Sequence, residues 1–377
     1  MATCDEHGLL PLEEALARLA AAVPAPDSGE ILADRDDPAL DRSAMDGAAL
    51  RSVDGVAPRR VLGTLFAGDD PAAFRIGPGD CVRLMTGACL PEGADAIVPV
   101  ELLRREGDLL APTEPPKAGD HIRRRGSQAR KGEVLLPAGA PRSAAADALR
   151  AQVGAALPAL RRARVGVAST GDELAAEPRP HQIRDSNGPM LTALAHRLGA
   201  DPVRLPSLPD DEPALRARLQ DLNGFDVLLT SGGVSMGEKD LLPDVLRELG
   251  AELLFHKIRL KPGKPMLAAR LGPTIILGLP GNPVSAYLNS LLFLPVALAR
   301  LEGRRLPDPW RQGELAAPVK NKGDRPLLTP CALDQGLLTP LRSQGSGDLV
   351  TLARAAACAW IQPGGAEAGA VRYLELI

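Results

Sequence analysis

The sequence predicts a multidomain protein in which a central α/β domain with a mostly parallel sheet lies between two regions of β structure. The chain has 377 residues, which is too long for one ordinary core. From residue 164 to about 303, short apolar runs alternate with helical patterns, as in a parallel sheet covered on both faces. On either side, the chain consists of short apolar runs broken by Gly, Pro and Asp, which are strand and turn signals.

The N-terminal part begins with a predicted helix, because leucines recur at spacings of three and four residues over 10–19, before Pro24 and Pro26. Strand-like runs fill 31–136 without a long helical period, and a second helical stretch follows at 143–154. We therefore expect an elongated β domain over 41–129. Residues 1–40 and 130–162 are expected to form a linking domain of helix and strands.

The central domain is expected over 163–305 and a small C-terminal β domain over 306–377. The predicted central strands are 164–170, 225–233, 252–258, 265–271 and 274–281, and the predicted helices are 189–200, 243–250 and 283–303. The predicted C-terminal strands are 314–322, 325–333, 336–343 and 359–364.

Composition argues against nucleic acid and membrane as partners. The formal net charge is −3 and only nine residues are aromatic, so neither a basic field nor a base-stacking platform is expected. The five cysteines are scattered without a Cys-x-x-Cys pair, which is typical of a reducing compartment. No signal peptide and no run of about 18 apolar residues is evident. We expect a soluble cytoplasmic protein.

Polar residues gather where four of the predicted strands end. In an open α/β sheet, ligands bind beyond the carboxyl ends of the strands, so these clusters are expected to meet at one edge. In chain order the cluster residues are Glu173; Ser231, Gly232, Gly233 and Asp240; Lys261 and Lys264; and Pro280, Pro283 and Ser285.

Each cluster has a chemical use as well as an ordinary structural one. A Ser-Gly-Gly turn before a helix exposes N–H groups suited to phosphate, and Lys257, Lys261 and Lys264 add positive charge. Asp240, Glu173 and Asp210 supply the oxygen ligands that Mg²⁺ prefers. Any one cluster also fits a plain strand-to-helix turn or a solvated lysine. Four at one edge favour a polyanion site with a metal ion.

The motifs together resemble the molybdopterin molybdenumtransferases, the bacterial MoeA-type proteins related to the gephyrin E domain. The resemblance runs from Leu10 to nearly the C-terminus, with the motifs in the same order. The motifs are SAMDG at 43–47, MTGA at 85–88, GAD at 93–95, TGDEL at 170–174, RDSN at 184–187, SGGVSMGEKD at 231–240, KPGKP at 261–265 and PGNPVS at 280–285.

The resemblance implies that the central domain binds molybdopterin and that the protein inserts molybdate into adenylated molybdopterin, with Mg²⁺, releasing AMP. It also implies a homodimer whose site lies between the α/β domain of one subunit and the β domains of the other. Further partners would be the adenylyltransferase and molybdoenzyme apoproteins. The matching residues are Asp240, Asp210 and Glu173 around metal and anhydride; Lys257 and Lys261 on oxyanions; Pro280, Pro283 and Ser285 lining the pocket; Asp46 and Thr86 from the elongated β region; and Ser346 from the C-terminal domain.

Departures from the family pattern leave alternatives open. Gln128 stands where the family usually has Asp, and Ala48 where it has Tyr. The C-terminal arginine, usually two residues after an aromatic, is not evident in 324–329, although Arg325 is near. The stretch 123–131 has five positive charges and no acid. Two interpretations fit this composition: a solvated turn, or a basic wall over the pocket. The alternatives are an adenylyltransferase-like enzyme, which would lack the flanking β regions, and a non-catalytic scaffold or regulator.

Overall fold

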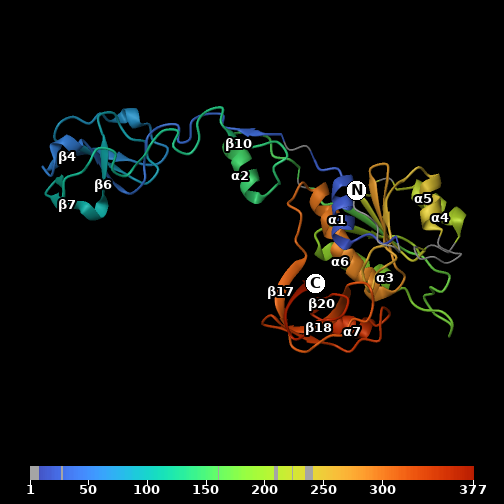
Figure 1. Ribbon diagram of the computed structural model, residues 1–377. Coiled ribbons are helices and arrows are strands. Elements are labelled where there is room, and N and C mark those ends of the chain that lie inside the picture. The colour runs from blue at the N-terminus through green and yellow to red at the C-terminus, as the bar shows by residue number, and fades with distance from the viewer. Residues whose placement is uncertain (1–7, 27–28, 160, 208–210, 223, 234–240) are drawn as a thin grey trace. The chain divides into compact units, whose positions relative to one another are not determined.

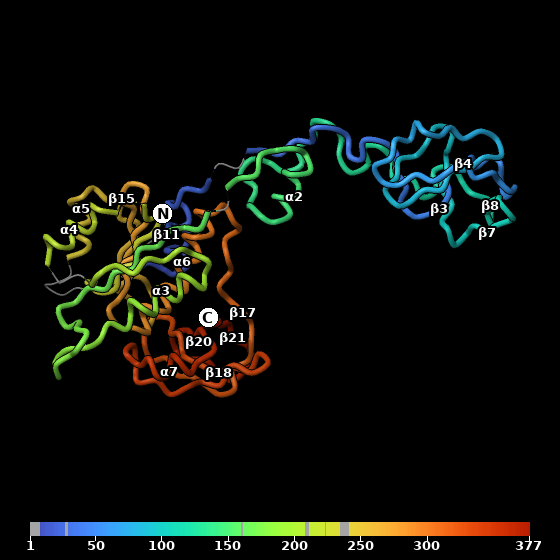
Figure 2. Tube along the Cα trace, turned by 180° about the vertical axis from the view of Figure 1, so that it is seen from behind, coloured from blue at the N-terminus to red at the C-terminus, as the bar shows by residue number. Residues whose placement is uncertain are grey.

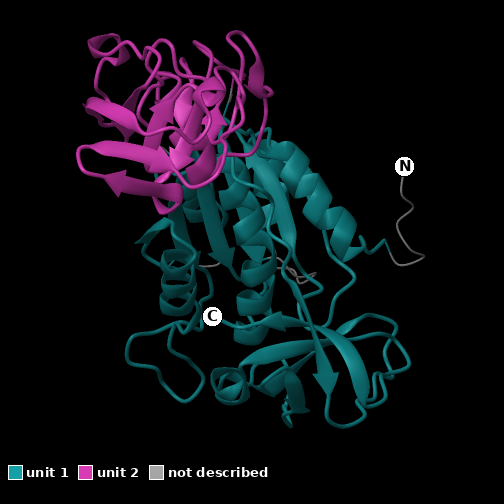
Figure 3. Cartoon of the chain, turned by 90° about the vertical axis from the view of Figure 1, so that its left-hand side faces the viewer, with its two compact units in different colours: residues 1–26, 159–377 teal, residues 27–158 magenta. Residues whose placement is uncertain are grey.

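The chain divides into two compact units, each with its own core. The computed structural model of the protein describes residues 8–26, 29–159, 161–207, 211–222, 224–233 and 241–377 (Figure 1). One unit comprises Met1–Pro26 with Ala159–Ile377, and the other comprises Asp27–Pro158 (Figure 3). We call them the main unit and the β unit.

Helices lie mostly in the main unit. The α-helices are α1 Leu12–Ala22, α2 Ala144–Gln152, α3 Asn187–Arg197, α4 Glu212–Gln220, α5 Leu242–Glu248, α6 Pro283–Leu301 and α7 Leu349–Arg354. Short 3₁₀ turns lie at Ser52–Asp54, Pro71–Ala73 and Val100–Leu102.

The strands follow the expected division into a β region, a central sheet and a C-terminal β domain. Those of the β unit are β1 Ile31–Leu32, β2 Arg42–Ser43, β3 Gly47–Leu50, β4 Arg59–Leu65, β5 Asp80–Leu84, β6 Ala96–Pro99, β7 Leu103–Glu106, β8 Leu109–Pro112, β9 Ile122–Arg123 and β10 Val134–Leu136. Those of the main unit are β11 Arg164–Ser169, β12 Asp201–Arg204, β13 Val227–Ser231, β14 Glu252–His256, β15 Leu267–Leu271, β16 Thr274–Leu279, β17 Trp310–Leu315, β18 Leu327–Asp334, β19 Leu337–Pro340, β20 Ala357–Ile361 and β21 Gly369–Glu375.

The central sheet has the order β12-β11-β13-β16-β15-β14. The first four strands pair in parallel, and β15 is antiparallel to both β16 and β14. The predicted fold class is confirmed, with a mixed sheet whose pairings are mostly parallel. Because β14 thereby runs in the same direction as β16, the carboxyl ends of β11, β13, β14 and β16 share one edge.

Alternating side chains bury both faces of this sheet. Val227 and Leu229 pack into the core formed with α1, α3 and α6, whereas Leu228 packs into the core formed with α4 and α5. Helices α4 and α5 lie side by side (Figures 1 and 2). The continuous apolar runs in the central strands follow from this coverage on both sides.

Two elements of this domain were not predicted, β12 and α4. Strand β12 reads Asp-Pro-Val-Arg and is only partly buried, so it lacks an apolar run. Helix α4 buries only Leu215 and Leu219, one turn apart, and its remaining face is polar. Both lie at the rim of the domain, where little apolar surface is needed.

Helix α6 bears on the expectation that the sequence holds no apolar stretch long enough to span a membrane. It is 19 residues long, and among the described residues it is the helix long and apolar enough to cross a membrane. However, 83% of its most apolar window is buried inside the protein. It packs against α1, α3 and the sheet. That burial is typical of a core helix and fits a soluble protein.

The C-terminal β domain is a closed barrel with the strand order β17-β19-β18-β20-β21. The strands predicted at 325–333, 336–343 and 359–364 correspond to β18, β19 and β20. The strand expected at 314–322 is wrong beyond Leu315, because β17 runs earlier, over Trp310–Leu315. Neither β21 nor α7 was predicted. The alternation of polar and apolar residues in β17 and β21 is too short to distinguish them from turns.

The β unit is built on a six-stranded sheet with the order β6-β3-β5-β4-β8-β7. Successive residues of β3 enter two small cores, Ala49 on one face and Ala48 with Leu50 on the other. Strand β1 pairs with β10 and β2 with β9, as two separate two-stranded sheets. The predicted β region at 31–136 and helix at 143–154 are present.

Arg372 of the barrel contacts α1 and both tryptophans. The Arg372 guanidinium lies 4.6 Å from the ring centre of Trp310 and 4.5 Å from that of Trp360. It also pairs with Glu13 of α1 at 3.2 Å. A guanidinium this close to two indole rings gains cation–π attraction from each, whereas the ion pair to Glu13 is largely exposed.

We predict that Arg372→Ala lowers the free energy of unfolding by about 1–2 kcal/mol, because two cation–π contacts are lost. Glu13→Gln is the control and should cost under about 0.5 kcal/mol, as an exposed pair contributes little. Urea unfolding followed by tryptophan fluorescence is suited to this test, since Trp310 and Trp360 are the only two tryptophans. Equal losses in the two variants would contradict the cation–π account.

Candidate functional site

The end of β13 is bonded to the end of β16 through one buried asparagine. Asn187, at the start of α3, donates from Nδ2 to Ser231 Oγ at 2.7 Å and to the Gly281 carbonyl at 2.7 Å. Ser231 Oγ in turn donates to the Pro280 carbonyl at 3.3 Å. The predicted residues Ser231 and Pro280 are therefore brought together, as the common strand edge requires.

Glycine is required where this edge is tightest. The φ angle of Gly232 is +102°, and a Cβ on it would lie 2.6 Å from the Thr170 carbonyl oxygen. Its N–H donates to the Leu279 carbonyl at 3.0 Å. The clusters after β11, β13 and β16 thus converge on Gly232, with Gly233 next in the chain. The continuation of this turn, 234–240, lies outside the described residues, and so does predicted Asp240.

The first cluster contributes an exposed carboxylate. Glu173 follows β11, and its carboxyl carbon lies 2.7 Å from where a Cβ on Gly171 would be. Its side chain therefore folds back over the turn. Asp210, like Asp240, lies outside the described residues. Among the described residues, no group of three His, Cys, Asp or Glu side chains could hold a metal ion. The metal role of Glu173, Asp210 and Asp240 therefore stays a prediction.

The lysine-bearing loop after β14 is held against α6. Gly263 has φ +117°, and its carbonyl accepts from Nδ2 of Asn289 at 3.0 Å. Asn289 is fully buried, and its Oδ1 lies 2.5 Å from where a Cβ on Gly263 would be. Lys261 and Lys264 flank this anchor and are exposed. The anchored glycine fixes the backbone between the two lysines.

Lys257 precedes this loop and is fixed through its backbone. It has a positive φ of 73°, its N–H donates to the Met266 carbonyl at 2.8 Å, and its carbonyl accepts from Leu10 N–H at 3.3 Å. An unusual left-handed conformation in a non-glycine residue points to a constraint from its surroundings.

A cavity of about 740 Å³ lies between the α/β domain and the barrel within the main unit. Of the predicted residues, Lys261, Lys264, Pro280, Ser285 and Ser346 line it. The described predicted residues of the main unit that do not line it are Glu173, Ser231, Gly232, Gly233, Lys257 and Pro283.

The charge of this cavity has one sign. Three lining residues, Lys261, Lys264 and Arg325, carry positive charge, and no Asp or Glu is among the lining residues in the described part of the chain. A cationic wall without carboxylates attracts anions and repels cations. The cavity is therefore suited to an oxyanion ligand.

The barrel wall of the cavity is fixed to α6 and α7. The Ser346 carbonyl accepts from the Val284 N–H in the first turn of α6 at 3.0 Å. Asp348 caps α7 and accepts from Gln344 N–H at 3.0 Å and from Thr351 Oγ1 at 2.7 Å. These bonds, led by the one from Gln344, lower the pKa of Asp348 to about 2. Ser346 and Ser285 are held on adjoining walls as a result.

Asp46 and Thr86, predicted together, are bonded together in the β unit. The Asp46 carboxylate accepts from the Thr86 hydroxyl at 2.7 Å and from the Thr86 N–H at 2.6 Å. These two bonds, the side-chain one first, hold the pKa of Asp46 below its usual range. The carboxylate is exposed, so it remains available to a ligand.

The basic stretch 123–131 is not the uncompensated positive wall that its sequence suggests. Arg124 pairs with Asp41 and Arg125 with Asp36, each at 2.7 Å. The Gln128 amide, oriented to satisfy both neighbours, donates to Asp37 and accepts from Arg123. The acids missing from the stretch come from the chain some ninety residues earlier.

Sequence reasoning missed Asn289 as a site residue. It includes Asn187 only within the RDSN motif at 184–187. Asn289 lies in an apolar helix whose pattern gave no reason to single out one amide. Arg325 had been considered without being assigned. Its place on the cavity depends on the loop before β18, which periodicity does not predict.

Family models cover nearly the whole chain. A model described as "MoeA N-terminal region (domain I and II)" matches residues 9–154, one described as "probable molybdopterin binding domain" matches 166–299, and one described as "MoeA C-terminal region (domain IV)" matches 312–371. The cavity lies between the segments that the second and third models match.

Curated relatives and solved structures agree with these matches. The molybdopterin molybdenumtransferase of Synechococcus elongatus is 38% identical over 288 residues, 72% of this chain and 71% of that protein. That of Bacillus subtilis is 36% identical over 70% of this chain and 65% of its own length. The crystal structure of the molybdopterin biosynthesis MoeA protein from Pyrococcus horikoshii OT3 is 26% identical, with a TM-score of 0.77 over 98% of this chain and 100% of that one.

We predict that Gly263→Ala displaces the lysine-bearing loop, because a methyl group there would collide with Asn289 at an unfavourable φ. It should lower the free energy of unfolding by about 2 kcal/mol or more and weaken anion binding. Gly272→Ala is the matched control: its φ is also positive, +58°, but nothing lies within 4 Å. It should cost about 1 kcal/mol and leave binding unchanged. Equal effects in both variants would rule out the steric anchor.

We predict that Thr86→Val raises the pKa of Asp46, because the largest cause of its lowered pKa is the Thr86 hydroxyl. With a lowered pKa in the folded state, Asp46 contributes stability above the usual pKa of Asp. That contribution is lost as the pH falls through the lowered pKa. NMR titration of the Asp46 carboxyl carbon would measure the shift. Thr113→Val, in the same unit but bonded to Leu102, should leave Asp46 unchanged; an unmoved Asp46 pKa in Thr86→Val would refute the assignment.

Proposed function

The chain belongs to the molybdopterin molybdenumtransferase family, and we propose that it inserts molybdate into adenylated molybdopterin and releases AMP. The family is one of transferases of molybdenum cofactor biosynthesis. Both proposed substrates are anions: molybdate carries two negative charges, and the adenylated pterin contains a phosphoanhydride.

The observation that carries this proposal is the cavity whose charged lining residues, within the described part of the chain, are all cationic. Lys261 and Lys264 on one wall and Arg325 on the other neutralise oxyanions that would otherwise repel one another and any attacking group. A phosphoanhydride is cleaved more readily when its oxygens are neutralised, because negative charge accumulates there in the transition state.

The first turn of α6 adds donors to the same wall. Pro283 occupies the first turn, so Ser285 lies at the N-terminal end of a 19-residue helix, where the helix dipole favours negative charge. Ser285 and Ser346 also supply hydroxyls. We assign them to binding and orientation of the substrate oxyanions, with Pro280 shaping the floor.

Proton delivery is assigned to the carboxylates outside the cavity. Replacing oxo ligands of molybdate by dithiolene sulfur requires protons, which a carboxylic acid can donate. Glu173 follows β11 at the edge that the cavity adjoins, and Asp240 comes after β13 in the chain. Asp46 of the β unit has a lowered pKa, so it is ionised at neutral pH and orients or accepts a proton rather than donating one. We propose catalytic roles for these three residues, together with Lys257 and Lys261.

Asp240, Asp210 and Glu173 are the proposed ligands of Mg²⁺. Carboxylate oxygens are suited to it, and it would neutralise phosphate oxygens. Because only Glu173 of the three is described, no step is assigned to the metal. We further propose a cytoplasmic homodimer in which Asp46 and Thr86 of one subunit complete the site of the other. The adenylyltransferase and molybdoenzyme apoproteins are the proposed further partners.

We predict that the chain restores molybdoenzyme activity in a bacterial strain lacking its insertase, whereas a non-catalytic scaffold would not.

Asp240→Asn should reduce AMP release from adenylated molybdopterin by about 10²-fold or more, because a charge is lost at the reacting anhydride. Its dimerisation should be unchanged. Wild-type rates in Asp240→Asn would remove this residue from the mechanism.

Two alleles in one strain test the shared site. Asp46→Ala and Asp240→Ala should each fail alone and restore activity together, because mixed dimers contain one intact site. If mixed dimers form and activity stays absent, the two residues do not act across subunits.

Removal of Mg²⁺ by a chelator should stop AMP release, and the return of Mg²⁺ should restore AMP release.

A further inference from the structure

The cavity between the α/β domain and the barrel is much larger than an oxyanion. Its volume of about 740 Å³ lies in the range of sites that enclose a whole organic molecule. A tetrahedral oxyanion needs on the order of 100 Å³, scaled from about 30 Å³ for one water molecule. The cationic side chains therefore account for only a small part of a ligand that fills this space.

Much of the remaining lining is apolar, and it comes from both domains. The barrel supplies three half-buried aliphatic side chains, Val319, Leu327 and Leu341. The α/β domain supplies three prolines, Pro262, Pro265 and Pro280. None of these six side chains has a hydrogen-bonding group, so this part of the cavity favours an apolar, uncharged part of a ligand.

The two walls are held together by backbone hydrogen bonds at Lys261. Its N–H donates to the Pro326 carbonyl at 2.9 Å, and its carbonyl accepts from the Leu328 N–H at 2.8 Å. Lys261 thus pairs with Leu327 in a parallel bridge at the start of β18. The position of Leu327 relative to the lysine-bearing loop is fixed as a result.

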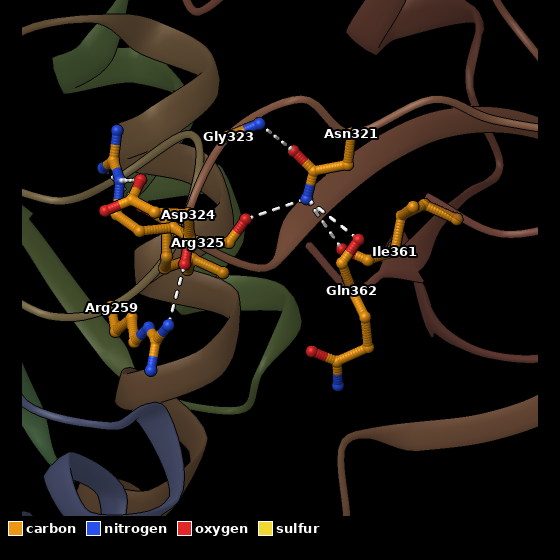
Figure 4. Close-up of polar contacts among 8 residues, drawn as sticks. Arg259, Asn321, Gly323, Asp324, Arg325, Ile361 and Gln362 are labelled. Carbon is orange, nitrogen blue, oxygen red and sulfur yellow. Dashed lines mark hydrogen bonds and ion pairs between the residues drawn. The ribbon is translucent and has the colours of Figure 1, made fainter. Parts of the chain in front are cut away.

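The turn before β18 reinforces this connection (Figure 4). Asn321 donates from Nδ2 to the Arg325 carbonyl at 2.8 Å and to the Ile361 carbonyl at 3.2 Å, which ties the turn to the end of β20. Arg259 of the α/β domain donates from Nη2 to the Asp324 carbonyl at 2.8 Å (Figure 4). The turn is therefore bonded to the barrel on one side and to the α/β domain on the other.

A second connection lies at the start of α6, where the Val284 N–H donates to the Ser346 carbonyl at 3.0 Å. Both residues line the cavity. Backbone bonds at two places therefore fix the separation of the apolar walls before a ligand arrives. A preformed space of this kind favours a rigid, flat body, because neither the ligand nor the domains must be ordered on binding.

The neutral polar lining narrows the chemical class of this body. Five uncharged polar residues line the cavity: Asn282, Ser285, Thr329, Ser343 and Gln344. A heteroaromatic ring has two apolar faces and a hydrogen-bonding edge, so it matches both kinds of lining. A purely aliphatic ligand would displace water from these polar groups without replacing its hydrogen bonds.

We propose that an uncharged planar heterocycle binds in this cavity, between the prolines of the α/β wall and the aliphatic side chains of the barrel. The inference rests on the proposed function for the identity of the ring. Adenylated molybdopterin offers two rings, adenine and pterin. Both have amino groups and ring nitrogens on the edge of a flat body, which is the chemistry that the lining recognises.

The test is the binding of two uncharged probes, adenosine and pterin, measured separately by equilibrium dialysis with the purified full chain. Because neither probe has a phosphate, its affinity should change by less than about twofold between low salt and about 0.5 M NaCl. At least one probe should bind, and the probe that is weakened by the substitutions below identifies the ring.

Leu341→Ala should weaken binding of that probe by about 10-fold, because the ring loses apolar contact with the barrel wall. Leu341→Met keeps the apolar contact and should bind within about threefold of the wild type. Val319→Ala changes a different segment of the same wall and should weaken binding by about threefold or more. Leu337→Ala is the matched control: Leu337 is 45% exposed on β19, is not a lining residue and should bind as the wild type does.

Three outcomes would overturn the proposal: no measurable binding of either probe to the wild type, unchanged binding in folded Leu341→Ala and Val319→Ala, or equal losses in Leu341→Ala and Leu337→Ala. Circular dichroism and thermal unfolding would verify that each variant is folded. These measurements need no turnover, so they stand apart from the complementation test. A chain that complements yet binds neither ring refutes the present inference alone. A chain that binds a ring through Leu341 yet fails to complement refutes the proposed activity.

Discussion

The close approach of Gly232 to Thr170 is the contact on which the candidate site depends. Parallel pairing of β11, β13 and β16 brings three chain ends to one edge, and these ends fit together only because position 232 has no side chain. The Asn187 bonds to Ser231 and Gly281 then tie the second and third ends. With this edge fixed, α6 starts at a defined point, and the barrel can bond to its first turn through Ser346. The cavity follows from that bond.

Buried asparagines hold the parts of the site that carry charge. Asn187, Asn289 and Asn321 are each at most 8% exposed, and each donates to backbone carbonyls of a loop that lines or adjoins the cavity. An amide satisfies buried carbonyls without bringing a charge of its own, whereas a buried lysine or carboxylate would need a compensating partner. The loops are thereby made rigid while the net positive charge of the cavity wall is left to Lys261, Lys264 and Arg325.

Sequence alone predicted the parts of the molecule that depend on local pattern. Apolar runs located β11, β13, β14, β15 and β16. The shared direction of β14 and β16 brings Lys261 and Pro280 to one cavity. The pattern did not reveal that Asp36 and Asp41 neutralise Arg125 and Arg124, because those pairs join residues more than eighty positions apart. Arg325 was considered as a replacement for the C-terminal arginine but was not assigned, for the same reason. Its position depends on Asn321 and Arg259, and neither contact leaves a periodic signal.

The distribution of charge separates binding from proton transfer. The described lining of the cavity has no carboxylate, while Glu173 stands outside it at the strand edge and Asp46 in the other unit. A carboxylate inside the cavity would repel the bound anions. Protonation would remove this repulsion, but the free energy needed to protonate the carboxylate would weaken binding. An exposed carboxylate outside the cavity, such as that of Glu173, can exchange protons with water. A cationic cavity whose described lining contains no acid therefore suits the binding of anions.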